Sequence, residues 1–143
     1  MHQACGGRRI GTEKLHATLA FLGACPEDRL PGVLAAANEV RAAAFELVID
    51  EACYWKHNRI AWAGASSLPS EVTLLSERLR DALSKSGFAF DPKPFVPHIT
   101  LVRDASRSRE LPRLAPIRWE VKSFALVQSS GGRYTIRSTS PLL

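Results

Sequence analysis

The feature that most constrains this chain is a short polar pattern that occurs twice, each time within or at the start of a stretch of strand-like alternation. A histidine, any residue, a threonine and a leucine form residues 16–19 and again residues 98–101. Residues i and i+2 of a β-strand point to the same face of a sheet. Each of these tetrads therefore presents one imidazole and one hydroxyl on one face and its leucine on the other. The pattern predicts two strands with matching polar faces.

The remaining hydrophobic pattern predicts an α+β fold built on antiparallel sheets. Apolar residues at helical spacing predict helices over residues 26–44 and 69–86. Alternation and turn residues predict strands over residues 15–22, 45–50, 52–56, 60–63, 98–103, 119–128 and 133–139. Gly131 and Gly132 are expected to join the last two strands in a hairpin. Strands outnumber helices and no linker separates independent domains, so residues 1–143 are expected to form a single domain.

The composition is that of a folded globular domain, and the sequence argues against a membrane span or a signal peptide. Of 143 residues, 45% are hydrophobic and 23% are charged, which is typical of globular domains. No apolar run is long enough to span a bilayer, and residues 1–14 resemble neither a signal peptide nor an anchor. We therefore expect no membrane partner.

The cysteines and the net charge bear on compartment and partners. The chain has three cysteines, Cys5, Cys25 and Cys53, which is an odd number, and they are widely spaced. This pattern argues against a disulfide framework or a zinc site, and it favours a reducing cytoplasm as the compartment. The net charge of +5 permits an anionic partner.

Two imidazoles and two hydroxyls that converge on one anion would suit phosphodiester cleavage. One imidazole would take a proton from the attacking oxygen and the other would give a proton to the leaving oxygen. The hydroxyls of Thr18 and Thr100 would donate hydrogen bonds to the phosphate oxygens, where negative charge grows. This chemistry requires no metal, and no carboxylates cluster as a two-metal site would need, so we expect neither a metal nor a cofactor.

The chain resembles the 2H phosphoesterase superfamily, which is named for paired H-x-[ST] motifs. The closer resemblance is to its LigT-like branch, the RNA 2′,3′-cyclic phosphodiesterases that were historically called 2′-5′ RNA ligases. Residues 7–23 resemble the approach to the first motif, residues 95–103 resemble the second, and residues 129–134 resemble a late glycine-rich stretch that ends in tyrosine. The resemblance covers nearly the whole chain. It implies two pseudo-symmetric lobes of antiparallel strands with flanking helices, and motifs that line the groove between them.

The resemblance also implies roles for individual residues. His98 would activate water and His16 would protonate the leaving ribose oxygen, which opens the cyclic ester to a 2′-phosphate; a ligation would swap these roles. Arg103 would contact phosphate. Strict alternation places Arg103 on the leucine face, so it is expected to lie beyond the strand end or at a β-bulge. Phe95 could contact a base or pack in the core.

One departure from the family concerns the start of the chain. Members usually have an apolar strand and a helix before the first motif, whereas this chain begins almost at the motif. Either the gene start is misassigned or the N-terminal strand and helix are missing. In the second case we expect an exposed sheet edge, with self-association or reduced stability.

Other readings stay open beside the leading one. Tyr54, Trp55 and Trp62 are expected to pack in the core, although aromatic rings can also stack on bases. The arginines of residues 104–116 could steer RNA or simply be solvated. The substrate could instead be a small cyclic nucleotide or 2′-5′ RNA ends to be joined. From another class, the chain could be a basic RNA-binding module without catalysis.

Overall fold

A computed structural model describes residues 1–90, 94–106 and 111–143 and divides the chain into two compact units. The first unit comprises Met1–Thr18, Leu47–Leu68 and Val96–Trp119, and the second comprises Leu19–Glu46, Pro69–Phe95 and Glu120–Leu143. Each unit collects segments that are distant in sequence. Both tetrads reach the first unit, apart from Leu19.

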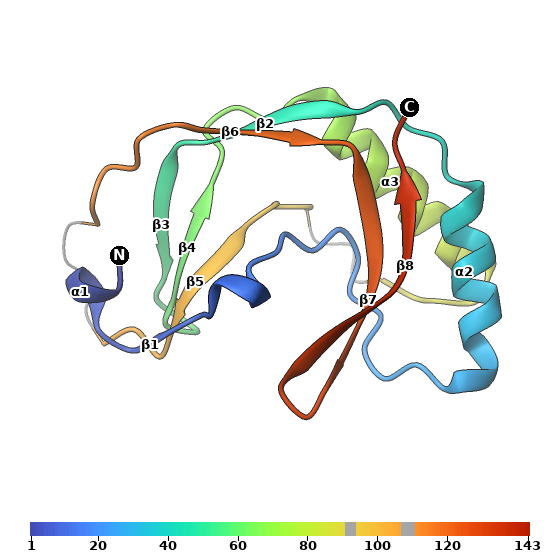
Figure 1. Ribbon diagram of the computed structural model, residues 1–143, viewed down its shortest axis with the longest axis horizontal. Helices are drawn as coiled ribbons and strands as arrows, with labels where there is room; N and C mark the ends of the chain where they lie inside the picture. The colour runs from blue at the N-terminus through green and yellow to red at the C-terminus, as the bar shows by residue number, and fades with distance from the viewer. Residues whose placement is uncertain (91–93, 107–110) are drawn as a thin grey trace. The chain divides into compact units, whose positions relative to one another are not determined.

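The first unit is built on a four-stranded antiparallel sheet (Figure 1). Its strand order is β1-β5-β4-β3. The strands are β1 (Arg8–Arg9), β3 (Glu51–Trp55), β4 (Ile60–Gly64) and β5 (Ile99–Arg103), and the helical turns before them are α1 (His2–Cys5) and η1 (Thr12–Lys14). A tight turn at residues 56–59 joins β3 to β4.

One face of this sheet is closed by small and apolar side chains. Cys5, Ala61, Val102 and Ala105 are each at most 1% exposed and form one cluster. Tyr54 packs against this cluster, and its hydroxyl donates a hydrogen bond to the carbonyl of Ala105. This buried face leaves the opposite face of the sheet for polar side chains.

A hydrogen-bonded pair holds the strand connection at the far end of β4. The hydroxyl and the amide of Ser66 both donate hydrogen bonds to the carboxylate of Asp50. These bonds favour the ionised form and hold the pKa of Asp50 below its ordinary value of 3.8.

The second unit pairs two helices with a long hairpin. It contains η2 (Glu27–Arg29), α2 (Leu30–Glu39), α3 (Ser70–Lys85), β7 (Ser123–Ser130) and β8 (Arg133–Pro141). The apolar stripe of α3 is buried through Val72, Leu75, Leu79 and Leu83. Gly131 and Gly132 both have positive φ angles, which a two-residue hairpin turn requires.

Strands β2 (Phe45–Ile49) and β6 (Ile117–Val121) pair with each other, and the boundary between the units falls within both of them.

The predicted α+β class with antiparallel sheets is confirmed, as are both helices, the hairpin and most strands, but three elements differ from their predicted ranges. The strand predicted over residues 15–22 is reduced to one β-bridge at Ala17, because the chain passes to the second unit at Leu19. The helix predicted over residues 26–44 ends at Glu39, where Val40 becomes extended. The strand predicted over residues 119–128 breaks at Lys122, where the chain changes its pairing partner from β2 to β8.

No helix within the described residues is both long enough and apolar enough to cross a membrane. The three cysteines are free thiols, with Cys5 buried.

Candidate active site

The two tetrads lie side by side at one edge of β5. An antiparallel bridge joins Ala17 to Ile99, the second residue of each tetrad. This register sets His16 across from Thr100 and Thr18 across from His98. Opposite residues of an antiparallel pair have Cβ atoms about 5 Å apart, and diagonal ones about 7–8 Å. The Cβ atoms of His16 and His98 therefore occupy one diagonal of a small square, and those of Thr18 and Thr100 occupy the other.

A break in the edge strand places the first tetrad where it can pair with β5. Arg9 pairs with Val102, and the amide of Ile10 donates a hydrogen bond to the carbonyl of Leu101. The 3₁₀ turn of η1 then interrupts the ladder, and the chain rejoins the same edge at Ala17. The edge of β5 is therefore covered in two short pieces.

Each imidazole is held by a hydrogen bond to the backbone carbonyl two residues before it. The Nδ1 atom of His16 lies 2.7 Å from the carbonyl oxygen of Lys14, and Nδ1 of His98 lies 2.9 Å from that of Val96. A carbonyl oxygen only accepts, so Nδ1 carries the proton in both rings. In the neutral ring this tautomer places the lone pair on Nε2, which is the atom a general base uses.

The two histidines differ in their surroundings. The ring of His16 is exposed, whereas that of His98 is half-buried. The indole rings of Trp55 and Trp62 pack edge-on against His98. The prediction that these two tryptophans pack in the core, with stacking on bases as the alternative, did not include a contact with His98. The strand-like alternation of β3 and β4 was the signal that could have placed them on the polar face.

A β-bulge places Arg103 on the polar face, whereas strict alternation would have left it on the leucine face. Ala61 pairs with Val102 and Trp62 pairs with Thr100, so Leu101 is the extra residue on β5. Val102 lies in the buried cluster, and the next residue points to the opposite face. The register therefore places Arg103 on the same face as His98 and Thr100. Of the two explanations foreseen for this arginine, the bulge applies, at Leu101, whereas Arg103 itself is the last residue of β5 and does not lie beyond the strand end.

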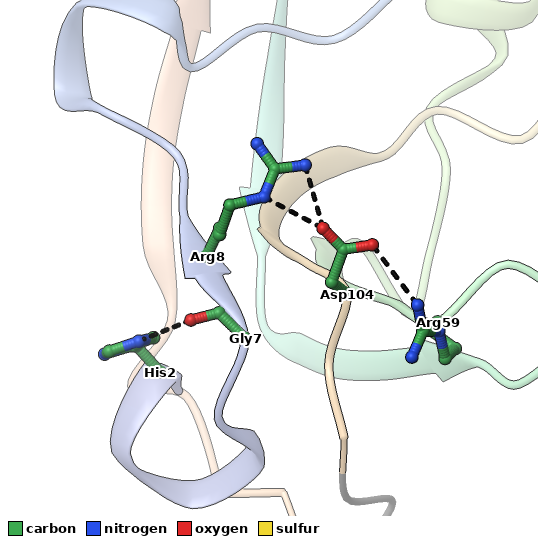
Figure 2. Close-up of polar contacts among 5 residues, drawn as sticks. All are labelled: His2, Gly7, Arg8, Arg59 and Asp104. Atoms are coloured by element: carbon green, nitrogen blue, oxygen red, sulfur yellow. Dashed lines mark hydrogen bonds and ion pairs between the residues drawn. The ribbon is translucent and has the colours of Figure 1, made fainter.

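An ionic network anchors the chain just beyond Arg103 (Figure 2). The carboxylate of Asp104 accepts two bonds from the guanidinium of Arg8, at 2.9 and 2.8 Å, and lies 3.4 Å from that of Arg59. The hydrogen bond from His2 to the carbonyl of Gly7 holds the segment before Arg8. Nothing in the sequence pattern had singled out Asp104.

Some residues singled out from the sequence are not part of this square. Phe95 belongs to the second unit, and its contact with a base stays a prediction. Arg107 and Arg109 lie outside the described residues. Within the described parts of the chain, no three histidine, cysteine, aspartate or glutamate side chains are grouped as ligands for a metal ion.

Comparisons with known proteins identify the family of this chain. The family model for LigT-like phosphoesterases matches residues 1–62 and 64–136. The RNA 2′,3′-cyclic phosphodiesterase of Escherichia coli is 35% identical over 93% of this chain and 76% of its own length. The enzyme of the same name from Thermus thermophilus is 32% identical over 92% of this chain and 73% of its own length.

A solved structure shares the fold. The crystal structure of E. coli LigT complexed with 3′-AMP superimposes with a TM-score of 0.88 and 32% identity, over 99% of this chain and 83% of the other. The match of the family model to nearly all of the sequence, together with this likeness of fold, shows that the chain belongs to the LigT-like phosphoesterase family.

Proposed function

We propose that this chain is an RNA 2′,3′-cyclic phosphodiesterase that opens the cyclic ester to a 2′-phosphate with His16 and His98 as its acid–base pair. The observation that carries the proposal is the bridge between Ala17 and Ile99, which brings the two tetrads together on one edge of β5. The names of the E. coli and T. thermophilus relatives support the same substrate class.

The diagonal arrangement suits an in-line displacement at phosphorus. Nε2 of neutral His98 takes a proton from water as the water oxygen bonds to phosphorus. The bond from phosphorus to the 3′ oxygen breaks, and the protonated ring of His16 gives its proton to that oxygen. The products are a 2′-phosphate and a free 3′ hydroxyl. The two imidazoles end the step with their protonation states exchanged, and solvent restores them.

The other diagonal would hold the phosphate. The hydroxyls of Thr18 and Thr100 would donate hydrogen bonds to the two non-bridging oxygens as their charge increases. Arg103 would add a guanidinium on the same face, which is suited to bidentate binding of phosphate. These steps use protein side chains alone.

Two variants test the proposal. We expect His16→Ala and His98→Ala each to lower kcat about 10²- to 10⁴-fold on an RNA with a 2′,3′-cyclic phosphate end, the usual contribution of one proton transfer. The rate should depend on pH as a bell-shaped curve, because one ring must be neutral and the other protonated. His57→Ala, an exposed histidine in the turn after β3, serves as the matched control. Hydrolysis that survives both active-site substitutions would contradict the proposal.

Two further expectations belong to this proposal. We place the protein in the cytoplasm, where its three free thiols would stay reduced. We also propose self-association through an outer strand of the first unit's sheet, β1 or β3. Light scattering during size-exclusion chromatography should then show a mass above 15.7 kDa that rises with concentration. A constant monomer mass would contradict it.

A further inference from the structure

Three aromatic rings of the first unit meet at one point on the polar face of its sheet. The centroid of the Trp55 ring lies 4.6 Å from that of His98, with the planes at 69°. The Trp62 ring lies 5.9 Å from His98 at 70°, and 4.7 Å from Trp55. Edge-to-face contacts at these separations are favourable for aromatic pairs. His98 is therefore in contact with two indole rings as well as with the carbonyl of Val96.

The strand register explains why these rings converge. Cys53 pairs with Trp62 and Trp55 pairs with Ile60, so Trp55 and Trp62 are diagonal neighbours on one face. Trp62 also pairs with Thr100, two residues after His98, which brings the polar residues of β5 to the same face. The contact is thus built into three neighbouring strands.

Two details bear on the orientation of the Trp62 indole. A Cβ atom at Gly64 would lie 2.5 Å from the six-membered ring of Trp62, so the absence of a side chain there makes room for the indole. The Nε1 atom of Trp62 is enclosed and has no hydrogen-bond partner among the described residues. Polar atoms enclosed without a partner are uncommon and often occur where a site requires a particular geometry.

We propose that Trp55 and Trp62 are positioning residues that hold the imidazole of His98 in its reactive orientation. The hydrogen bond to Val96 fixes which way the ring is flipped, and the two indoles restrict how far it swings about its first side-chain torsion. This inference rests on the proposed acid–base role of His98. A ring held in place needs no search for its orientation before each proton transfer.

Substitutions at Trp55 test the positioning role through kcat and KM. We expect Trp55→Leu to lower kcat roughly 10- to 100-fold, with KM changed less than about 2-fold because the indole is not assigned to substrate binding. Trp55→Phe keeps an aromatic ring and should restore most of the rate. Trp119→Phe changes the remaining tryptophan of the chain, which is 38% exposed, and is the matched control. A Trp55→Leu variant that folds and retains full kcat would overturn the inference.

A spectroscopic experiment tests the ring contact independently of substrate. The His57 ring also lies near Trp55, with centroids 6.3 Å apart, so the experiment uses a protein that carries both Trp119→Phe and His57→Gln. Its emission comes from Trp55 and Trp62, and a protonated imidazole in contact quenches indole fluorescence. Emission should fall in step with the protonation of His98, and this step should disappear in the added variant His98→Gln. An identical pH response with and without His98 would overturn the contact.

The two proposals fail in different ways. If the protein does not open a cyclic phosphate but the fluorescence step is present, the proposed function fails and the ring contact stands. If the protein is active and Trp55→Leu keeps the full rate, the positioning role fails and the proposed function stands.

Discussion

The hydroxyl of Thr100 lies across from His16 in the square, where it would donate a hydrogen bond to a phosphate oxygen of the substrate. We expect Thr100→Val, which keeps the shape and removes the donor, to lower kcat about 10²-fold. Steady-state kinetics on an RNA with a cyclic phosphate end measure the effect.

The matched control for this threonine is Thr100→Ser, which keeps a hydroxyl and loses only a methyl group. It should remain within several-fold of the parent rate. If the serine variant is as slow as the valine variant, Thr100 serves as strand packing and the hydrogen-bonding role is wrong.

At this scale the sequence predicted the residue types of the site but not the groups that hold them. Alternation alone put His98 and Thr100 on one face, because it depends only on local strand geometry. The carbonyls of Lys14 and Val96 were not foreseen, because every residue has a carbonyl and its direction depends on the folded backbone. The contact of Trp55 with His98 depends on the register of two other strands.

The end of β5 is fixed by a close contact between two backbone segments. Gly7 has a φ of +82°, and a Cβ atom there would lie 2.4 Å from the carbonyl oxygen of Arg103. We expect Gly7→Ala to cost about 1–2 kcal/mol for the left-handed backbone and roughly 1–3 kcal/mol more for the overlap. The displaced strand end should also raise KM, because Arg103 moves. Chemical denaturation and steady-state kinetics report the two effects.

Gly131→Ala separates the overlap from the backbone cost. Gly131 has a comparable φ of +57° in the hairpin turn, and a Cβ atom there would meet no atom within 4 Å. This variant should lose only the left-handed contribution and keep its KM. Equal losses of stability for the two alanine variants would show that the contact at Arg103 is unimportant.

Elements whose stability is local were the ones that the sequence predicted well. Helix α3 carries a continuous apolar stripe and ends before Gly87, and both limits were placed within one residue. The prediction of a strand over residues 15–22 was wrong for a nonlocal reason. The alternation there is that of a strand, but the chain leaves the sheet after Ala17. The bulge at Leu101 was foreseen only because the implied role of Arg103 conflicted with strict alternation.

For the molecule as a whole, neither the residue pattern nor the family resemblance supplied the order of the strands. The pattern predicted antiparallel sheets and two helices, but it did not say which strands are neighbours. The order β1-β5-β4-β3 joins strands from the start, middle and late part of the chain. Such pairings depend on long-range packing and are therefore weakly encoded in any one segment.

The net charge of +5 leads to a prediction about how substrate size affects salt dependence. An RNA end that brings about three phosphates onto a basic surface should give a slope near −2 in a plot of log kcat/KM against log salt, since each contacted phosphate of a single strand contributes about −0.7. Raising salt from about 50 to about 200 mM should then lower kcat/KM roughly 20-fold. A mononucleotide 2′,3′-cyclic phosphate presents one phosphate and should lose only about 3-fold. Equal slopes for the two substrates would mean that the basic surface does not bind the rest of the RNA, and would favour a small cyclic nucleotide as the natural substrate.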